Sequence, residues 1–385
     1  MQDIHELCLN RGIDSCISFF SGTNEGEGHS YKIGNSIDHK IHALLSRVTG
    51  LQAHFSTIST LRFIRFVSVY KPNLIHIHNI HSSFINVYLV LRWLSVQKIP
   101  VVITLHDCWF LTGGCTHFTR FECNKWENGC GRCPSFHSNS PLSLIDSTGF
   151  NWRGKRAALN RLEKLAFVGV SRWVAQLTKK CNLSSAMTAV IYNGIDLSVF
   201  KPTPSDIKSQ IGLKGKFVIM GPADKWLLDC NRICLQKLVS LLASDQVLLL
   251  FGCRETQRRI ISNKITYYKH TTDVHELVEL YSMADVFVNS TRQDTLSLIN
   301  IEAQACGTPV ITFNNTGASE TVDGNCGFLV DNEDIDQMVF YINRVQHNGK
   351  GLYSHSCRKW VSEHFNKTTN YLKYLELYSS LVRKK

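Results

Sequence analysis

The sequence predicts an α/β protein made of two Rossmann-like, doubly wound domains. Short apolar segments rich in β-branched residues recur along the chain and alternate with segments of helical periodicity. Buried strands that alternate with helices are typical of parallel sheets built from right-handed βαβ units. The 385 residues are too many for one ordinary hydrophobic core, so we expect two cores.

The predicted elements follow one another with one clear interruption. Residues 193–206 contain an Asn-Gly pair and two prolines, which are unfavourable inside strands and helices, so a domain boundary is expected there. The prediction is an N-terminal domain at 1–200, a second domain at 201–365 and an amphipathic C-terminal helix at 366–385. The carboxyl ends of both sheets would face a shared cleft. Strands are predicted at 74–78, 101–105, 167–171, 189–193, 217–220, 247–251, 286–289 and 309–313, and helices at 151–164, 230–243 and 274–283.

Composition and charge narrow the class of protein. The net charge is +11, and residues 1–200 hold 20 Lys and Arg against 12 Asp and Glu. Such a surplus favours an anionic partner, although a solvated basic surface explains it equally simply. No nucleic-acid-binding motif is present and the basic residues are dispersed, so nucleic acid is not expected as a partner. No apolar run reaches the length of about 20 residues that crosses a membrane, and no signal-peptide pattern opens the sequence, so a cytoplasmic protein is expected.

The segment 290–313 carries the clearest chemical pattern. Asp294 lies in the loop after the predicted strand 286–289, and Glu302 lies in the helix that follows. The amides at the start of that helix suit a phosphate, and a nearby carboxylate can accept hydrogen bonds from sugar hydroxyls, so a nucleotide sugar is the implied ligand. The alternative is that Asp294 is an ordinary loop acid and Glu302 pairs with a lysine. Within the helix, the residues expected to face inward are Leu298, Ile301, Ala305 and Cys306.

The stretch "RQDTLSLINIEAQACGTPVITFNNTGASETVDGNCGFLV" resembles the donor-site signature of the family 4 retaining glycosyltransferases, also called glycosyl transferase group 1, which have the two-domain GT-B fold. The nearest kin are enzymes of bacterial exopolysaccharide, capsule and lipopolysaccharide synthesis. The resemblance implies transfer of a sugar, with retention, from a nucleotide-diphosphate sugar to a glycan or lipid-linked acceptor. It implies no cofactor for catalysis. The donor-binding residues that it implies are Glu302 for the ribose, Thr295, Leu296, Ser297 and Gly317, with Asp294 on the transferred sugar and Glu320 in the following turn.

The resemblance continues through the N-terminal half. His106, in "TLHD" at the end of the predicted strand 101–105, matches a histidine that lines the reaction centre in the family, so His106 and Asp294 are predicted as the catalytic pair. His76 and His78 would lie on one face of a strand, a spacing compatible with a metal. Because the family uses no metal there, these two and His81 are predicted to line the cleft or to be structural.

Two departures from the family pattern bear on function. The chain opens with residues that resemble the helix and second strand of the first domain, so the first strand of that domain is expected to be missing. The family's cations for the donor diphosphate are also absent from the segment after strand 217–220, where Lys225 and Arg232 are the predicted substitutes. Loss of cations would remove electrostatic stabilisation of the leaving group. An alternative is therefore a relative that binds nucleotide or glycan without turnover.

Four cysteines between the predicted strands form a separate pattern. Cys115, Cys123, Cys130 and Cys133 include a Cys-x2-Cys pair, and the four lie within twenty residues of one another. This spacing suits a structural zinc ion in tetrahedral coordination. The alternative is four reduced thiols in an ordered loop.

A surface helix in the N-terminal half is predicted to touch an anionic membrane. Arg62 and Arg65 alternate with Leu61, Phe63, Ile64 and Phe66. Basic and apolar side chains on one surface helix favour peripheral binding, by charge alone or by charge with insertion of Phe63.

Overall fold

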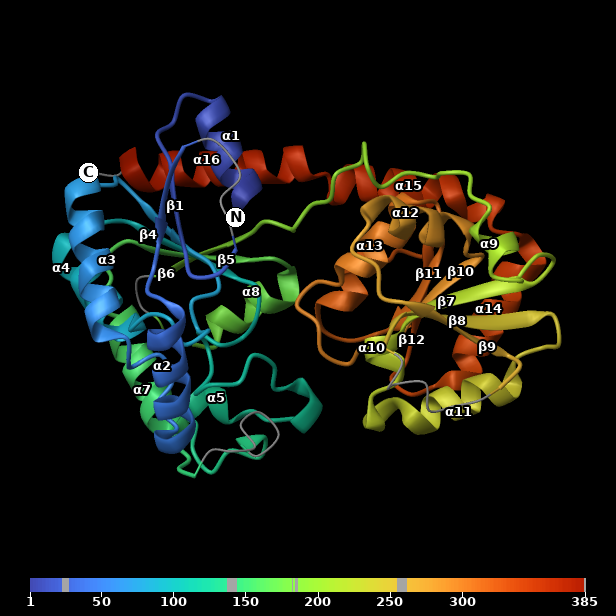
Figure 1. Ribbon diagram of the computed structural model, residues 1–385, viewed down its shortest axis with the longest axis horizontal. Coiled ribbons are helices and arrows are strands. Elements are labelled where there is room, and N and C mark those ends of the chain that lie inside the picture. The colour runs from blue at the N-terminus through green and yellow to red at the C-terminus, as the bar shows by residue number, and fades with distance from the viewer. Residues whose placement is uncertain (23–27, 137–143, 182, 184–185, 255–261, 384–385) are drawn as a thin grey trace. The chain divides into compact units, whose positions relative to one another are not determined.

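The computed structural model describes residues 1–22, 28–136, 144–181, 183, 186–254 and 262–383 (Figure 1). Contacts divide the chain into two compact units. Unit 1 comprises Met1–Ile191 and Tyr371–Lys385, and unit 2 comprises Tyr192–Asn370. All strand pairs in both units are parallel, which confirms the predicted α/β class.

Unit 2 contains one six-stranded sheet with the strand order β12-β11-β10-β7-β8-β9. Numbered within the unit, this is the doubly wound order 3-2-1-4-5-6 read from the β9 edge. The chain order therefore reverses between β7 and β10, near the middle of the sheet. The strands are β7 (Phe217–Pro222), β8 (Gln246–Cys253), β9 (Ile265–Lys269), β10 (Val286–Asn289), β11 (Val310–Phe313) and β12 (Gly327–Val330).

Helices cover both faces of the unit 2 sheet (Figure 1). On one face α11 (Arg232–Leu241) packs against α14 (Ile335–Asn348), and on the other α13 (Leu298–Ala305) packs against α12 (Val274–Met283) and α15 (Gly351–His364). The core between these layers is apolar and buried, as both-face coverage of a parallel sheet requires. Shorter elements are α9 (Ile207–Gln210), α10 (Ala223–Trp226), η2 (Asp229–Asn231) and η4 (Thr316–Thr321).

Unit 1 is built around a four-stranded sheet with the order β3-β4-β5-β6. The strands are β3 (Ile75–Ile77), β4 (Val101–Leu105), β5 (Leu165–Gly169) and β6 (Ala186–Val190). Helices α1 (Gln2–Asn10) and α16 (Lys367–Arg383) supply apolar side chains to one core with this sheet, in which Tyr374 and Leu377 pack with Val102 and Val168. The other helices are α2 (Ser36–Thr49), α3 (Thr57–Tyr70), α4 (Val87–Gln97), α5 (Lys125–Asn128), α7 (Thr148–Leu159) and α8 (Arg172–Lys179), with η1 (Thr119–Phe121).

A second, two-stranded sheet in unit 1 pairs β1 (Cys16–Phe19) with β2 (His29–Lys32). It shares no hydrogen-bonded strand neighbour with the four-stranded sheet. A doubly wound order would need one more strand between β1 and β3, and the described residues form none there.

Several elements differ from the prediction. Strands β2, β9 and β12 were not predicted, and β5 and β6 begin earlier than expected. Helix α13 begins at Leu298, and Leu298 is 37% exposed, so the prediction that it faces inward is wrong. The other three residues expected inside that segment, Ile301, Ala305 and Cys306, are buried.

In the described part of the chain, no helix combines the length and apolar character needed to cross a bilayer.

Candidate functional site

The reversal of strand order in unit 2 marks the place where a doubly wound sheet binds its ligand. Ligands of such sheets lie beyond the carboxyl ends of the two strands that flank the reversal. These strands are β7 and β10. Residues 223–231 follow β7 and residues 290–297 follow β10, so the predicted acid and both substitute cations belong to or adjoin these two connections.

A close approach of backbone and side chain shapes the end of β7. A Cβ atom on Gly221 would lie 2.6 Å from Nε1 of Trp226 and 2.9 Å from the carbonyl oxygen of Val288, so only glycine fits without displacement. Nε1 of Trp226 donates to the same Val288 carbonyl at 3.1 Å. The buried indole therefore links α10 to β10 and fixes the turn that carries Lys225.

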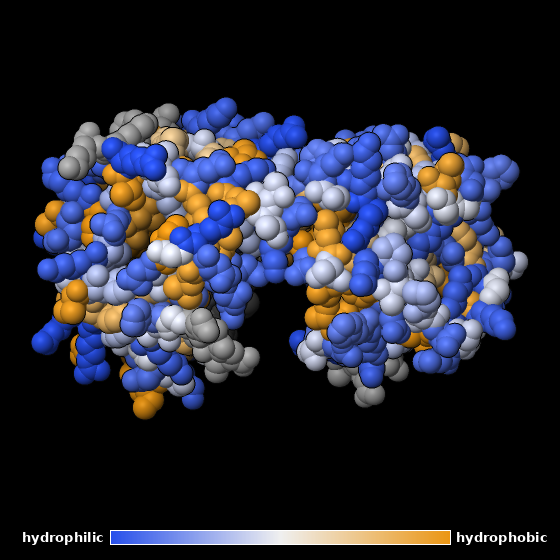
Figure 2. All heavy atoms as spheres, turned by 90° about the horizontal axis from the view of Figure 1, so that it is seen from above, coloured by the Kyte–Doolittle hydropathy of each residue, from blue (hydrophilic) through white to orange (hydrophobic). Residues whose placement is uncertain are grey.

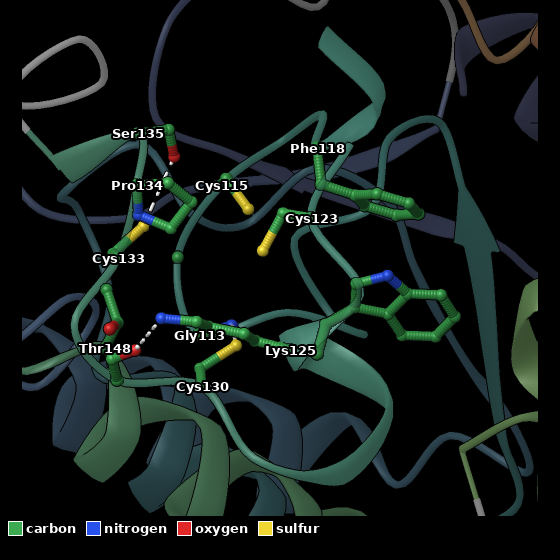
Figure 3. Close-up of a pocket in the computed structure, with 13 residues that line it drawn as sticks. Gly113, Cys115, Phe118, Cys123, Lys125, Cys130, Cys133, Pro134, Ser135 and Thr148 are labelled. Carbon is green, nitrogen blue, oxygen red and sulfur yellow. Dashed lines mark hydrogen bonds between the residues drawn. The ribbon is translucent and has the colours of Figure 1, made fainter. Parts of the chain in front are cut away.

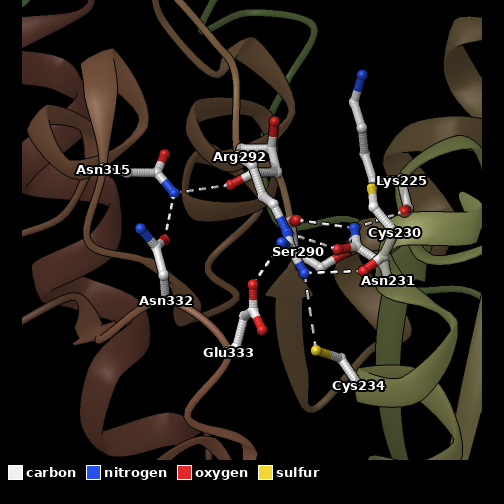
Figure 4. Close-up of polar contacts among 10 residues, drawn as sticks. Lys225, Cys230, Asn231, Cys234, Ser290, Arg292, Asn315, Asn332 and Glu333 are labelled. Atoms are coloured by element: carbon white, nitrogen blue, oxygen red, sulfur yellow. Dashed lines mark hydrogen bonds and ion pairs between the residues drawn. The ribbon is translucent and has the colours of Figure 1, made fainter. Parts of the chain in front are cut away.

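Asn231 and Arg292 form a polar clamp across the reversal point (Figure 4). The buried Asn231 donates from Nδ2 to the carbonyl oxygens of Lys225 at 2.9 Å and Ser290 at 3.1 Å. Its Oδ1 accepts from Nε of Arg292 at 2.9 Å, and Arg292 also donates to the Cys230 carbonyl at 2.9 Å. The half-buried guanidinium of Arg292 is thus held just after β10, against the connection that follows β7.

The loops after β10 and β11 are joined through Asp294. Its backbone carbonyl accepts from the amide of Gly317 at 3.0 Å, and its amide donates to Oγ1 of Thr316 at 3.3 Å. One carboxylate oxygen accepts from the amide of Leu296 at 3.2 Å. The structure therefore brings together Asp294, Leu296 and Gly317, which were predicted from separate parts of the sequence pattern.

A buried polar network links the start of α13 to the end of β10 and to η4. Nδ2 of Asn289 donates to Oγ of Ser297 and to Oδ1 of Asn300, both at 2.9 Å, and Asn300 donates to Oγ1 of Thr321 at 3.0 Å. All four residues are buried. The side chains of Thr295, Leu296 and Ser297 are also buried, so these residues can offer a ligand only their backbone. The first-turn amides of α13 have no helical carbonyl partner, as at any helix N-terminus.

Glu302 lies one turn into α13 with its carboxylate against Tyr281. Its Oε2 accepts from the Tyr281 hydroxyl at 2.9 Å. Burial raises the pKa of Glu302, and the hydrogen bond from Tyr281 opposes that rise. No lysine pairs with Glu302 within the described residues, so the alternative of a Lys–Glu pair is not what this part of the structure contains. The carboxylate keeps a second oxygen as an acceptor.

The two predicted substitute cations have different environments. Nζ of Lys225 lies 3.2 Å from Oδ2 of Asp224, and the lysine side chain is 33% exposed. Arg232 is exposed at the first position of α11. Sequence reasoning missed Arg292 and Asn231, although both could be found: each follows a strand that flanks the strand-order reversal, and Arg292 lies inside the recognised signature.

Histidines gather at the carboxyl ends of β3 and β4 in unit 1. Nδ1 of His78 lies 2.9 Å from Nε2 of His106, and His76 contacts Tyr378 at 2.6 Å and Thr104 at 2.7 Å. Burial lowers the pKa of His106 to about 4 and that of His76 to about 3, and it lowers the pKa of His78 well below its usual value. These imidazoles are neutral at neutral pH, so His106 can exchange hydrogen bonds with a sugar hydroxyl but carries no charge.

A pocket of about 430 Å³ lies beside this cluster within unit 1. Nε2 of His81 donates to Oδ2 of Asp107 at 2.6 Å, and the other oxygen of Asp107 accepts from the amide of Trp109 at 2.8 Å. Gln52 accepts from the Trp109 indole at 2.8 Å. This volume lies in the range of small-molecule sites, of about 300–1,000 Å³. Its lining also includes one face of α2, formed by His39, Ala43, Ser46 and Arg47.

The four predicted zinc ligands lie together in the connection after β4. Cys115, Cys123, Cys130 and Cys133 line one small cavity (Figure 3). Among the described residues, no group of three or more His, Cys, Asp or Glu side chains is arranged to hold a metal ion as it stands. His76 contacts Tyr378 and Thr104, and His78 contacts His106. In the described part of the chain these histidines do not form a group that could hold a metal ion.

Comparison with solved structures shows which class this architecture belongs to. The sucrose-phosphate synthase of Thermosynechococcus elongatus matches with a TM-score of 0.70 at 17% identity, covering 100% of this chain and 92% of that one. The Anabaena protein HepE, crystallised with UDP and glucose, matches with a TM-score of 0.66 at 15% identity, over 98% of this chain and 94% of that chain. The fold is that of the GT-B glycosyltransferases, with two Rossmann-like domains.

Comparison of sequences identifies the family. Residues 23–199 match the family described as Glycosyltransferase Family 4, and residues 235–363 match the family described as Glycosyl transferases group 1. The chain therefore contains the domains of a family 4, group 1 glycosyltransferase, as the signature predicted. It is 26% identical over 360 residues to the putative colanic acid biosynthesis glycosyl transferase WcaC of Escherichia coli K12, covering 88% of this chain and 84% of WcaC. It is 28% identical over 148 residues to the capsular polysaccharide biosynthesis glycosyltransferase CapM of Staphylococcus aureus, covering 35% of this chain and 38% of CapM.

Proposed function

We propose that this protein transfers a sugar from a nucleotide-diphosphate sugar to a glycan or lipid-linked acceptor in bacterial surface polysaccharide synthesis, with retention of configuration. The observation that carries the proposal is the geometry at the carboxyl edge of unit 2. There the strand-order reversal, Asp294 and the start of α13 lie together, and Glu302 lies one turn into that helix. The relatives WcaC and CapM, named for colanic acid and capsular polysaccharide synthesis, support the choice of pathway class.

In this proposal unit 2 binds the donor. Glu302 accepts the ribose hydroxyls with the oxygen that Tyr281 does not use. Asp294 accepts hydroxyls of the transferred sugar, and the first-turn amides of α13 bind the diphosphate or the sugar. Arg292 supplies the positive charge at the end of β10, and Lys225 reaches the same edge from β7. A fixed cation stabilises the charge that develops on the leaving diphosphate. HepE, whose crystals contain UDP and glucose, supports a donor of this class.

Unit 1 would supply the acceptor side. His106 contributes a neutral imidazole at the end of β4, and the pocket lined by Arg47, Gln52, His81 and Trp109 offers room for a sugar acceptor. The donor's own phosphate oxygen takes the acceptor proton, so no protein base is required. The catalytic contribution of His106 and Asp294 is then to position the reacting groups.

Helix α2 relates this pocket to a membrane surface. One face of the helix lines the pocket, while a second face exposes five apolar residues at helical spacing. We call these residues the α2 stripe: Ile37, Ile41, Leu44, Leu45 and Val48, which are 38–70% exposed. The space-filling view shows apolar patches between hydrophilic side chains on the surface of unit 1 (left part of Figure 2). A lipid-linked acceptor would reach the pocket if the α2 stripe met the bilayer.

The side-chain contacts of α3 change the residue that is expected to insert. Phe63 and Phe66 lie against Tyr31, with ring centroids 5.9 Å and 4.3 Å away, and both are half-buried. Leu61 is 52% exposed beside the exposed Arg62 and Arg65. We therefore propose that Leu61 and the α2 stripe, rather than Phe63, provide the apolar contact with an anionic membrane.

The donor proposal is tested with Glu302→Gln. The amide has the shape of the carboxyl and its oxygen can still accept from Tyr281, so the fold should persist. Titration calorimetry with UDP, GDP, ADP and TDP should find one nucleotide that binds the wild type and binds the variant at least about ten-fold more weakly, a loss of about 1.4 kcal/mol. Glu363→Gln, an exposed acid on α15, is the matched control and should bind as the wild type does. Equal affinity of Glu302→Gln and wild type would remove the ribose role.

A second candidate function is nucleotide or glycan binding without turnover. This function is favoured because both cations near the donor edge already have protein partners. Lys225 lies beside Asp224, and Arg292 contacts Asn231, Cys230 and Glu333. The two functions are separated by measuring release of the nucleotide diphosphate from a bound nucleotide sugar. Release shows hydrolysis or transfer and supports the transferase. Binding without release of nucleotide diphosphate in the presence of polysaccharide precursors would favour the second.

A further inference from the structure

We propose that the connection after β4 holds one structural zinc ion on the thiolates of Cys115, Cys123, Cys130 and Cys133. This site is separate from the donor edge of unit 2 and does not depend on the proposed reaction. Zinc with four cysteine ligands is a closed, tetrahedral site that contributes to folding rather than to chemistry. The observations behind it are the cavity shared by the thiols, their orientation and the charge around them.

The four thiols face a single cavity of about 20 Å³ (Figure 3). A space of about 10–15 Å³ already holds one water molecule, so the cavity fits one ion. Because no three ligands in the described residues are arranged to hold a metal ion as they stand, zinc must draw the thiols inward. The turn between Cys130 and Cys133 allows this: Gly129 and Gly131 have φ of 151° and 137°, and nothing lies within 4 Å of the Cβ position of either.

Polar groups around the cavity already orient the sulfur atoms. The amide of Gly113 donates to Sγ of Cys130 at 3.2 Å, and Oγ of Ser135 lies 3.2 Å from Sγ of Cys133. Nζ of Lys125 donates to the carbonyl oxygens of Gly131 at 3.2 Å and Arg132 at 2.7 Å, which lie between Cys130 and Cys133. Donors that point at ligand atoms are the usual outer shell of a metal site.

A buried lysine of α7, which interacts electrostatically with two of the four cysteines, also bears on the site. Lys155 is 1% exposed, donates to the carbonyl of Trp109 and lies 3.7 Å from the centre of the Trp109 ring. In the described part of the chain no carboxylate lies within ion-pair distance of its ammonium. Buried charges are normally paired. The charges of Cys115, Cys130 and Asp107 would each stabilise the Lys155 ammonium. Four thiolates on one Zn²⁺ carry a net negative charge, which would add an anionic partner nearby.

The site would support the wall of the unit 1 pocket. Cys115 and Cys133 line both the small cavity and the pocket of about 430 Å³. In the described part of the connection that holds them, the regular elements are short: η1 has three residues and α5 has four. Metal binding to such a segment contributes directly to its ordering. The zinc ion would therefore fix the pocket wall at Gly114 and Cys115.

The test measures metal in the full chain, purified without a histidine tag under reducing conditions. Plasma mass spectrometry should find about one zinc per chain. Cys130→Ser and Cys133→Ser should each reduce this to below about 0.1, whereas Cys16→Ser, a half-buried cysteine of β1, should retain it. Cobalt added to the metal-free wild type should give the thiolate charge-transfer and d–d absorption of a tetrahedral site.

The cobalt titration uses the wild type, so it stands even if a serine variant fails to fold. Folded wild type without zinc and without the tetrahedral cobalt spectrum would overturn the proposal. Three other results would also overturn it. These are iron in place of zinc, zinc that persists in both Cys130→Ser and Cys133→Ser, and disulfides among the four cysteines in protein purified under anaerobic conditions.

Discussion

Unit 2 carries its candidate site on the edge of one six-stranded sheet, whereas unit 1 carries its polar clusters beside a divided sheet and in the long connection after β4. In unit 2, Asn231 and Arg292 satisfy each other across the strand-order reversal. In unit 1, burial keeps His76 and His78 neutral and leaves Lys155 without a carboxylate partner in the described residues. The buried neutral histidines make the stability of unit 1 depend on pH, and the proposed zinc site would make it depend on a metal as well.

The largest expected effect of this difference is acid unfolding of unit 1. Burial lowers the pKa of His42 to about 4 and that of His76 to about 3, and it lowers the pKa of His78 well below its usual value. The unfolded state takes up protons below about pH 6.5 and the folded state does not, so stability is lost as pH falls from there toward the folded-state values. Each histidine costs at most about 1.4 kcal/mol per pH unit.

Hydrogen exchange at pH 7.5 and pH 5, corrected for intrinsic rates, checks this separately for each unit. Unit 1 amides should lose protection by several kcal/mol, and unit 2 amides should lose less. Equal loss in both units, or none in β3 and β4, would contradict the assignment of acid sensitivity to the buried histidines.

The next effect concerns the packing of unit 2. Gly221→Ala would place a Cβ 2.6 Å from Trp226 and 2.9 Å from the Val288 carbonyl. We expect unit 2 to lose about 2 kcal/mol, as overpacked cores do. Gly324→Ala is the control, because nothing lies within 4 Å of its Cβ position and its φ is not positive. Urea unfolding of the two variants and the wild type measures the loss of stability. A Gly221→Ala protein as stable as the wild type would show that the β7–β10 contact can relax.

A smaller effect is expected from the cation at the reversal point. Arg292→Gln keeps a polar side chain but removes the charge, so affinity for the nucleotide diphosphate should fall about ten-fold, or about 1.4 kcal/mol. Affinity for the corresponding nucleoside should change less. Arg344→Gln, an exposed arginine of α14, is the control. If diphosphate and nucleoside lose affinity equally, Arg292 acts on the loop and not on the diphosphate.

The smallest effect concerns the surface of unit 1. The double variant Ile41→Ser, Leu44→Ser should weaken co-sedimentation with anionic vesicles at high salt, where the contribution of Lys40 and Arg47 is screened. At low salt each basic residue contributes about 1 kcal/mol, so binding should largely persist. Val96→Ser, 70% exposed on α4, is the control. Wild type that fails to pellet at low salt would exclude peripheral attachment by this surface.

The same comparison explains which parts of the structure could be predicted. Strands 101–105 and 286–289 and helix 274–283 were predicted with their observed bounds, because burial on both faces gives continuous apolar runs and Asp273 caps α12. Strand β2 was missed because its sequence, His-Ser-Tyr-Lys, is polar and exposed. Helix α13 begins only at Leu298, and Asp294 accepts the Leu296 amide in a turn before it.

Site residues were predictable only where a motif carried them. Asp294, Glu302 and Gly317 were found from the signature, and the structure places Asp294 and Gly317 in direct contact. Arg292 and Asn231 act together across 61 positions of sequence, which local spacing does not reveal. The α2 stripe was missed because its apolar spacing resembles that of a helix packed on a core, and only the exposure of Ile41 and Leu44 distinguishes the two.

The central claim is that the carboxyl edge of unit 2 binds the nucleotide diphosphate of a sugar donor. Hydrogen exchange with and without the nucleotide diphosphate that binds in calorimetry tests it most directly. The account predicts protection in 290–302, 316–321 and 221–231, with the strongest protection in the first turn of α13. Protection confined to the amino edge of the sheet or to unit 1, or no change in 290–302 at saturating nucleotide, would contradict it.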